Sequence, residues 1–223
     1  MTDAPTGPLD MLKAMAVVEV DEAPGLVHIE LFTMKGLLSV LWHGPHDADR
    51  VVVALGGAMG GLLGPGKGLY PTLGQTLAAE GIGLMRVSYR KSNDLDRCTL
   101  DAGAALDLAW RRGARRFVTL GHSFGGAVAI RTAVAMPAVA GVVTYATQSA
   151  GCEPAAHLDG RPLLLIHGSN DRILPLAASL AVRELADGGE LVILDGEDHL
   201  LAGAQDELLE RTLRFVRLTM PTA

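Results

Sequence analysis

A serine between glycines is the clearest candidate for chemistry in this sequence. Residues 121–125 read Gly-His-Ser-Phe-Gly, the pattern G-x-S-x-G, with Ser123 at its centre. A serine hydroxyl is a poor nucleophile on its own, so this chemistry needs an exposed, strained turn where a base can reach it. Side chains at Gly121 and Gly125 would collide where a strand and a helix pack closely. In a chain with 27 glycines the string can arise by chance, so its context decides.

The segments on either side of Ser123 predict a strand followed by a helix. Residues 117–120 form a short apolar run, and residues 124–136 are apolar nearly all round, which is typical of a helix packed centrally against a sheet. The serine would then stand at a helix N-terminus, where free N–H groups and the helix dipole stabilise negative charge. In open α/β sheets, ligands bind beyond the carboxyl ends of the strands. We expect Ser123 to lie at such an end.

The rest of the chain predicts an α/β architecture that positions this turn. Three β-favouring runs separated by turn residues favour antiparallel hairpins at 15–20, 26–32 and 37–42. Short apolar runs typical of strands buried on both faces follow at 51–55, 83–88, 117–120, 141–145, 163–167 and 191–194. Helix candidates alternate with them at 70–80, 99–112, 124–136, 175–186 and 202–220.

Parallel strands joined by crossover helices give a doubly wound sheet with helices on both faces. The N-terminal hairpins form an antiparallel edge of that sheet. We expect a single domain over residues 1–223, because a chain of 223 residues is an ordinary length for one α/β domain. Residues 1–13, with prolines and a glycine, are expected to form a loose N-terminal tail.

Two further strand ends offer a base and the carboxylate that orients it. Asp171 follows the run at 163–167, and His199 follows the run at 191–194. Both are therefore expected on the same sheet edge as Ser123. The chain order Ser, Asp, His is one of the orders found in catalytic triads.

Other residues compete for these roles. Asp171 has a structural alternative, because aspartate is a common turn former. Asp195 and Asp198 are rival carboxylates in the loop that holds His199. The sequence has six further histidines with weaker claims, because they lie in the N-terminal hairpins, in a loop or at strand ends: His28, His43, His46, His157, His122 and His167.

An acyl-transfer site also needs backbone N–H groups aimed at the developing oxyanion. One donor is expected from Phe124, directly after the serine. The other is expected from residues 56–61, Gly-Gly-Ala-Met-Gly-Gly, whose glycines allow close backbone approach. We assign it to Ala58, with Met59 as the alternative one register away, and expect Gly57 and Met59 to contact the substrate. This loop lacks the spacing of the common nucleotide-binding motifs, so a nucleotide site is disfavoured.

Composition excludes several other classes of function. Hydrophobic residues make up 49% and charged residues 20%, a globular composition, and a net charge of −6 disfavours a nucleic-acid partner. Cys98 and Cys152 give neither a disulfide framework nor metal-ligand spacing, so we expect no metal site and a reducing compartment. The sequence shows neither a signal peptide nor about 18 successive apolar residues. We therefore expect a cytoplasmic protein without a membrane partner, and the sequence does not indicate its oligomeric state.

Together these motifs resemble those of the α/β-hydrolase family. Residues 121–126 are similar to its nucleophile elbow, 167–171 to its acid loop and 196–199 to its histidine loop, and the resemblance covers about residues 17–215. It implies a mostly parallel sheet of roughly eight strands, a covalent acyl-enzyme, and neither a metal nor an organic cofactor. Many members carry His-Gly where this chain has Gly-Gly at 56–57, so the register of the oxyanion loop stays open.

The segment at 146–162 is too short for the helical lid of larger family members, so the chain resembles small, lidless esterases, thioesterases and dienelactone-hydrolase-like proteins. The resemblance implies that Ser123 attacks a small-molecule ester or thioester while His199 takes its proton and Asp171 orients His199. An open site favours accessible or modest acyl groups. Cys152 and Glu153 lie in the short segment, where each either lines the site or serves loop structure.

Two sets of alternatives stay open at this point. Peptide cleavage, C–C bond hydrolysis and acyl transfer all occur on such scaffolds, and a non-catalytic ligand-binding protein is a further possibility. Three basic residues within or just after the run at 83–88 are expected to be exposed near the edge of the site: Arg86, Arg90 and Lys91. They either favour an acidic substrate or act as solvated charges.

Overall fold

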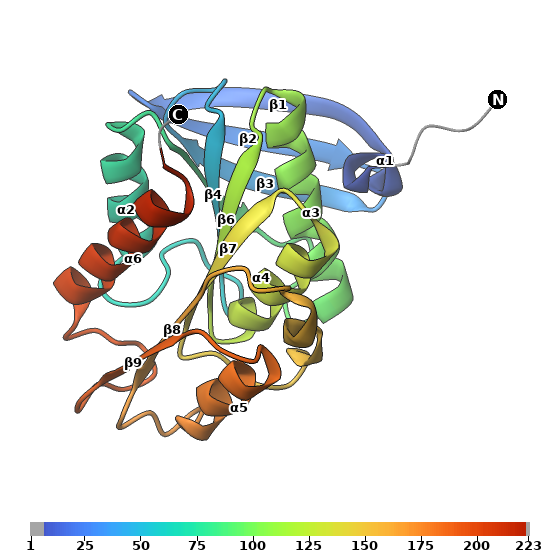
Figure 1. Cartoon of the computed structure of the whole chain (residues 1–223). Coiled ribbons are helices and arrows are strands. Elements are labelled where there is room, and N and C mark those ends of the chain that lie inside the picture. Colours follow the sequence, from blue (N-terminus) through green and yellow to red (C-terminus); the bar gives the residue numbers. More distant parts are fainter. Residues whose placement is uncertain (1–6, 222–223) are drawn as a thin grey trace.

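Within residues 7–221, nine strands form one sheet (Figure 1). The structure is a computed structural model that describes residues 7–221. In chain order the strands are β1 (Ala14–Ala23), β2 (Leu26–Thr33), β3 (Gly36–His43), β4 (Arg50–Leu55), β5 (Gly83–Ser88), β6 (Arg116–His122), β7 (Val139–Tyr145), β8 (Leu163–Gly168) and β9 (Glu190–Leu194). The nine runs predicted from the sequence each form one of these strands. The resemblance implied roughly eight.

The strand order in the sheet is β1-β2-β3-β5-β4-β6-β7-β8-β9. Strands β1, β2, β3 and β5 pair antiparallel, and β5, β4, β6, β7, β8 and β9 pair parallel. The predicted antiparallel N-terminal edge is therefore confirmed. Because β4, β6, β7, β8 and β9 are mutually parallel, their carboxyl ends meet at one edge of the sheet.

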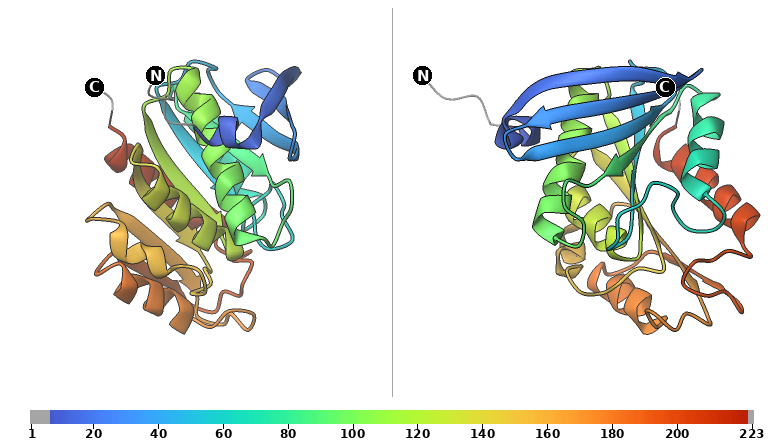
Figure 2. Two further views of the ribbon diagram at one scale, coloured as in Figure 1. Left: turned by 90° about the vertical axis from the view of Figure 1, so that its right-hand side faces the viewer. Right: turned by 180° about the vertical axis from the view of Figure 1, so that it is seen from behind.

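Helices cover both faces, as predicted (Figure 2). The helices are α1 (Pro8–Leu12), α2 (Leu69–Ala78), α3 (Leu95–Arg111), α4 (Phe124–Ala135), a short 3-10 helix η1 (Glu153–His157), α5 (Ala177–Leu185) and α6 (Gln205–Thr219). One apolar core lies between the sheet and α1, α3, α4 and α5, and a second lies between the sheet and α2 and α6. Helix α4 is buried along most of its length, as its apolar sequence predicted.

The predicted loose tail over residues 1–13 is wrong for Pro8–Leu12, which form α1. Proline is compatible with the first turn of a helix, because its missing N–H would have no partner there. Leu9 and Leu12 are buried, and the Leu9 N–H donates to the Asp107 carboxylate at 3.1 Å. Residues 1–6 of that predicted tail lie outside the described residues.

Helix α3 begins at Leu95, four residues before its predicted start at residue 99. The Asp94 side chain accepts a hydrogen bond from the Arg97 N–H at 3.2 Å and so caps the first turn. This capping extends the helix back through a polar stretch whose periodicity gave no helical signal.

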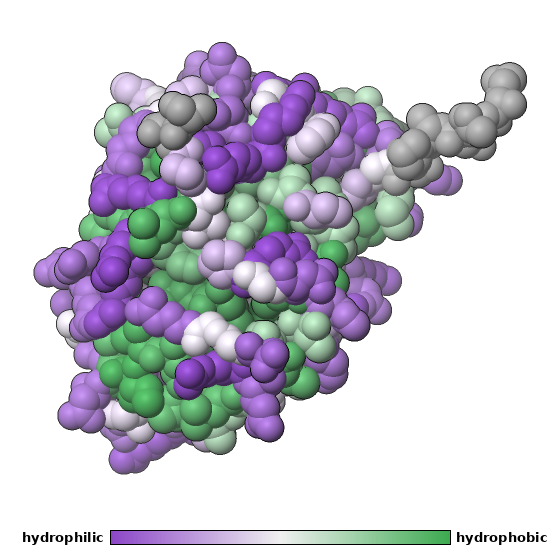
Figure 3. Space-filling model, viewed as in Figure 1, coloured by the Kyte–Doolittle hydropathy of each residue, from purple (hydrophilic) through white to green (hydrophobic). Residues whose placement is uncertain are grey.

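The connection between β7 and β8 carries only η1, and no lid domain covers the carboxyl edge of the sheet in the part of the chain that the structure describes. A shallow apolar groove lies instead at the amino ends of β8 and β9, beside α6, on the face that is green in Figure 3. Leu164, Phe215 and Leu218 line it. Among residues 7–221, no helix is both long and apolar enough to cross a bilayer.

Candidate active site

Ser123 occupies the single residue between the end of β6 and the start of α4. Its backbone angles are φ 59° and ψ −121°, a conformation that residues other than glycine rarely adopt. Such strain costs about 1–3 kcal/mol and persists only where the surroundings impose it. Here the Ser123 N–H donates to the Tyr145 carbonyl at 2.8 Å, and the Gly126 N–H donates to the Ser123 carbonyl at 3.0 Å. The strained turn predicted from the motif is therefore present.

The glycines of the motif make room for this turn. A Cβ atom at Gly121 would lie 2.0 Å from the Gly125 carbonyl oxygen, and a Cβ atom at Gly125 would lie 2.4 Å from the Gly56 carbonyl oxygen. Both distances are far below van der Waals contact, and the neighbouring atoms belong to the backbone. The steric reason predicted for Gly121 and Gly125 is confirmed.

Asp171 and His199 form a buried hydrogen-bonded pair. Asp171 lies three residues beyond β8 and His199 five beyond β9, and His199 Nδ1 is 2.7 Å from Asp171 Oδ2. A carboxylate accepts, so Nδ1 carries the proton and His199 Nε2 is left as the basic nitrogen. The other Asp171 oxygen accepts the N–H groups of Ile173 at 2.8 Å and Leu174 at 2.9 Å. The carboxylate is thus held at both oxygens.

The charge state of Asp171 follows from these contacts. Burial alone would raise the pKa of Asp171, but the hydrogen bonds from His199 and from the backbone of Leu174 and Ile173 outweigh it. The net effect places the pKa below its ordinary value of 3.8. Asp171 is therefore ionised at neutral pH and suited to stabilise a positive charge on His199.

The elbow and the histidine loop touch through the residue before the serine. His122 Nε2 lies 2.9 Å from the His199 carbonyl oxygen, and the two imidazole rings have centroids 4.9 Å apart. Among residues 7–221, the Ser123 hydroxyl makes no hydrogen bond to His199, so of the predicted triad the structure joins only His199 and Asp171 directly. Catalytic hydrogen bonds are often long without substrate and tighten when it binds.

The glycine-rich loop after β4 passes beside the serine. A tight turn brings the Gly60 N–H to the Gly57 carbonyl at 2.8 Å, with Ala58 and Met59 at its corners. A Cβ atom at Gly57 would lie 3.7 Å from the Ser123 Cβ. Ala58 packs against the core, whereas the Met59 side chain is 96% exposed. The loop is therefore close enough to the elbow to contribute a backbone donor.

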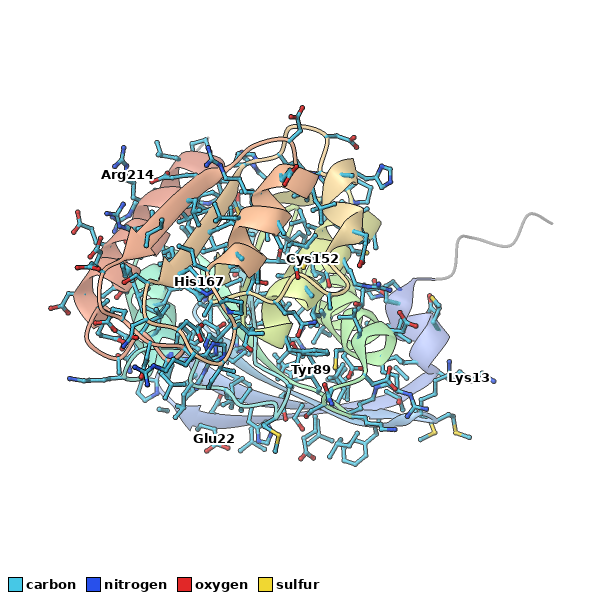
Figure 4. All side chains as sticks on the ribbon, turned by 90° about the horizontal axis from the view of Figure 1, so that it is seen from below. Lys13, Glu22, Tyr89, Cys152, His167 and Arg214 are labelled. Carbon is cyan, nitrogen blue, oxygen red and sulfur yellow. The ribbon has the colours of Figure 1, made fainter. Side chains whose placement is uncertain are left out.

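Two histidines that sequence reasoning left as strand-end residues belong to the site. His167 is fully buried beside Asp171, and it is labelled left of the centre of the view in Figure 4. Its Nε2 is 2.9 Å from the Leu174 carbonyl oxygen and 3.3 Å from Asp171 Oδ2, and its Nδ1 is 2.7 Å from the Ser179 hydroxyl. His167 thereby ties the acid loop to α5. In the sequence, the position of His167 four residues before Asp171 was the one indication that its side chain could lie near that carboxylate.

The second is His122, whose contact with His199 is described above. Burial lowers the pKa of His122 to about 4, although the hydrogen bond to the His199 carbonyl acts in the opposite direction. The ring is therefore neutral at neutral pH. Because a carbonyl oxygen accepts, the proton of this neutral ring resides on Nε2.

Two of the basic residues expected to be exposed near the site edge are buried. Arg86 is 6% exposed and donates to the Leu62 carbonyl at 3.3 Å. The Arg90 side chain is equally buried and pairs with Asp101 at 2.5 Å. Burial and pairing make these arginines structural, and only Lys91 of the three is exposed.

Cys152 does not line the site. It is fully buried in the core, and its thiol donates to the Gln148 carbonyl at 3.2 Å. Burial raises the pKa of this thiol to about 12, so it stays protonated. Cys152 is therefore part of the loop structure, which was the alternative weighed from the sequence.

Comparison with known proteins places the fold. No family model and no curated protein matches the chain. Among solved structures, it is similar to Est1E from Butyrivibrio proteoclasticus, with a TM-score of 0.72 and 14% identity over 93% of this chain and 100% of the other. It is similar to a dienelactone hydrolase from Anabaena variabilis, with a TM-score of 0.74 and 17% identity over 92% and 100%. It is also similar to an acetyl xylan esterase from Paenibacillus sp. R4, with a TM-score of 0.73 and 14% identity over 96% of this chain and 91% of the other. The chain thus has the α/β-hydrolase fold.

Proposed function

We propose that this protein is a serine hydrolase that cleaves a carboxylic ester or thioester through an acyl-enzyme. The observation that carries the proposal is the His199–Asp171 hydrogen bond on the same sheet edge as the strained Ser123 turn. An ionised, doubly held carboxylate behind an imidazole is what a general base needs in order to accept a serine proton. Solved structures of similar fold that are named as a dienelactone hydrolase and an acetyl xylan esterase support the same class of reaction.

The proposed reaction has two halves. In the first, Ser123 Oγ bonds to the carbonyl carbon while His199 Nε2 takes the hydroxyl proton, and Asp171 stabilises the imidazolium. The N–H groups of Phe124 and Ala58 hold the oxyanion. The tetrahedral intermediate then collapses, the bond to the alcohol or thiol breaks, and His199 protonates that leaving group. In the second half, water attacks the acyl-enzyme with His199 as base, which releases the acid and regenerates the serine.

The shape of the edge bears on the substrate. None of the described elements forms a lid over it, and three large apolar side chains beside the proposed machinery are exposed: Met59, Ile173 and Leu200. Apolar side chains in this position favour contact with an uncharged acyl or alcohol group over a highly charged substrate. We propose a small, accessible ester or thioester as substrate, with Gly57 and Met59 beside it. Free, buried Cys98 and Cys152 agree with the reducing cytoplasm that we propose as its location.

Pre-steady-state kinetics test the proposal. With a short-chain p-nitrophenyl ester, the wild type should release a burst of p-nitrophenol close to one equivalent per active site, because acylation precedes a slower deacylation. Ser123→Ala should abolish the burst and lower turnover by at least about 1,000-fold. Ser149→Ala, at a serine without a catalytic assignment, is the matched control and should retain the burst. Full turnover by a folded Ser123→Ala protein would overturn the proposal.

A substrate panel separates this reaction from others on the same scaffold. Esters, thioesters and aminoacyl amides with one common acyl group should differ in kcat/KM, with esters or thioesters preferred. A preference for amides of more than about tenfold, or about 1.4 kcal/mol in transition-state free energy, would favour peptide cleavage instead.

A further inference from the structure

His122 connects the two parts of the proposed site that must meet during the reaction. It lies between Gly121 and Ser123 at the end of β6, and its side chain reaches into the histidine loop. In the structure this loop, predicted at 196–199, is taken as residues 195–201, directly after β9. The Nε2 atom donates to the His199 carbonyl at 2.9 Å, and the ring packs against the His199 ring at a centroid distance of 4.9 Å. The residue next to the nucleophile thus binds the backbone of the residue that serves as its base.

Other contacts hold the histidine loop but do not relate it to the elbow. The His199 ring is bound to Asp171, the Leu200 N–H donates to the Asp198 side chain, and the Gly66 N–H donates to the Leu200 carbonyl at 2.6 Å. Within residues 7–221, the His122–His199 contact is the one hydrogen bond between residues 121–126 and the histidine loop. It therefore sets the position of the histidine backbone relative to Ser123.

The neutral state of His122 suits this position. A protonated imidazole beside His199 would repel the imidazolium that forms when His199 accepts the serine proton. Burial keeps His122 neutral at neutral pH, with one proton on Nε2 and none on Nδ1. His122 thus supplies a hydrogen-bond donor to the loop without adding a charge next to the base.

We propose that His122 is a positioning residue whose Nε2–H fixes His199 within reach of the Ser123 hydroxyl. The inference rests on the proposed serine hydrolase function and adds a residue outside the triad to it. An error of about 1 Å in the placement of a catalytic group can cost about 100-fold in rate. The Ser123 hydroxyl itself makes no hydrogen bond to His199 within residues 7–221, so the backbone contact at His122 is the direct link between the two groups.

Two substitutions distinguish the donor from the ring. His122→Phe keeps a planar ring against His199 but removes the N–H, and His122→Gln keeps an amide N–H at about the reach of Nε2. For a short-chain p-nitrophenyl ester, we expect His122→Phe to lower kcat about 10- to 100-fold with KM within about twofold of wild type. His122→Gln should restore kcat to within about fivefold. The rate at which a fluorophosphonate phosphonylates Ser123 should fall in His122→Phe and recover in His122→Gln, in parallel with kcat.

A spectroscopic readout separates positioning from a structural role. The proton on His199 Nδ1, held at 2.7 Å by Asp171, should give a downfield resonance in the proton NMR spectrum of the wild type. His122→Phe should broaden or shift this resonance, because the histidine loop loses its link to the elbow. His122→Gln should keep it. Matching thermal unfolding of all three proteins serves as the control.

If His122→Phe does not fold, His122→Asn replaces it, because the asparagine amide is too short to reach the His199 carbonyl while glutamine reaches it. Wild-type kcat, KM and labelling rate in a variant without the donor would overturn the positioning role. Equal losses in the glutamine and phenylalanine variants would overturn it as well, because the N–H would not matter. Neither result would affect the proposed function, which is tested separately by the burst and turnover of Ser123→Ala and by labelling of the wild type.

Discussion

The elbow at residues 121–126 and the two loops that carry Asp171 and His199 are held in place by different means. Backbone geometry fixes the elbow, because Gly121 and Gly125 have no space for a side chain and Ser123 keeps a strained conformation through main-chain hydrogen bonds. Side chains fix the loops, because the Asp171 carboxylate accepts hydrogen bonds from His199 Nδ1 and from two backbone N–H groups of its own loop.

Because the two regions are held differently, we expect substitutions in the elbow and in the loops to change different properties of the protein. A new side chain in the elbow meets immovable backbone, so its cost falls on stability. The loss of a hydrogen-bonding group in the loops leaves the backbone in place, so its cost falls first on the orientation of the base and hence on rate. The substitutions below test that division, from the largest expected effect to the smallest.

Asp171→Asn should have the largest effect, a fall in kcat of about 10,000-fold with an unchanged fold. An amide in place of the carboxylate favours the wrong tautomer of His199 and no longer stabilises the imidazolium. Steady-state hydrolysis of a p-nitrophenyl ester measures it. Asp195→Asn and Asp198→Asn, at the rival carboxylates, are matched controls with expected changes below about threefold. A larger loss at Asp198 than at Asp171 would reassign the orienting carboxylate.

Gly121→Val should abolish soluble, folded protein or lower the free energy of unfolding by at least about 3 kcal/mol. Its Cβ would lie 2.0 Å from a carbonyl oxygen of the elbow. Gly196→Ala in the histidine loop is the control, because nothing lies near a Cβ atom at that position and its cost comes from the positive φ of 74° alone. It should cost only about 1–2 kcal/mol. Urea unfolding compares them, and equal costs would mean that the elbow has no special constraint.

The contact between the two regions should be visible in the pH dependence of stability. Burial lowers the pKa of His122 and of His43 to about 4 from the ordinary value of 6.5. The unfolded chain therefore binds these protons first, and unfolding free energy should fall as pH drops from about 6.5 to about 4, then show no further loss from these groups. Each histidine contributes up to about 1.4 kcal/mol per pH unit within that window.

His122→Gln should remove one of these two contributions, and His43→Gln the other, far from the catalytic edge. Urea unfolding at half-unit pH intervals measures both slopes. Asp171 acts in a lower range, because its pKa is depressed below 3.8 and its contribution is lost only as pH falls through that folded value. A slope in the His122→Gln variant equal to that of wild type would contradict the buried, neutral state of His122.

Ser123→Gly, which removes the nucleophile, should give the smallest change in stability, a gain of about 1 kcal/mol. Glycine adopts φ 59° and ψ −121° without the strain that serine carries there. A shift of the urea midpoint at constant slope measures the gain. No gain would mean that the turn carries no backbone strain at this residue, and the elbow would then resemble the loops in how it is held.

Much of this arrangement was predictable because local patterns dictate it. Short apolar runs identified all nine strands, and helix-length segments between them identified the five long helices to within a few residues. The order of strand ends in a parallel sheet then placed Ser123, Asp171 and His199 on one edge. These inferences rely on periodicity and connection rules, which a single sequence contains.

The features that escaped prediction depend on contacts between distant segments. Helix α1 is stabilised by Asp107 and by burial of Leu9, neither of which its five residues reveal. Arg90 looked like a solvated charge because its partner, Asp101, comes from the next helix. His122 was assigned to a strand end because its partner is a backbone carbonyl far along the chain. Such pairings follow from tertiary packing, so propensity and spacing do not encode them.

The most direct test of the central claim is covalent labelling of the folded wild-type protein with a fluorophosphonate, followed by mass spectrometry of the peptides. The account predicts one adduct per chain, located on Ser123, and no adduct in Ser123→Ala or in wild type unfolded by urea. Folded wild-type protein that stays unlabelled, or that carries its adduct on another residue, would contradict the assignment of Ser123 as the nucleophile.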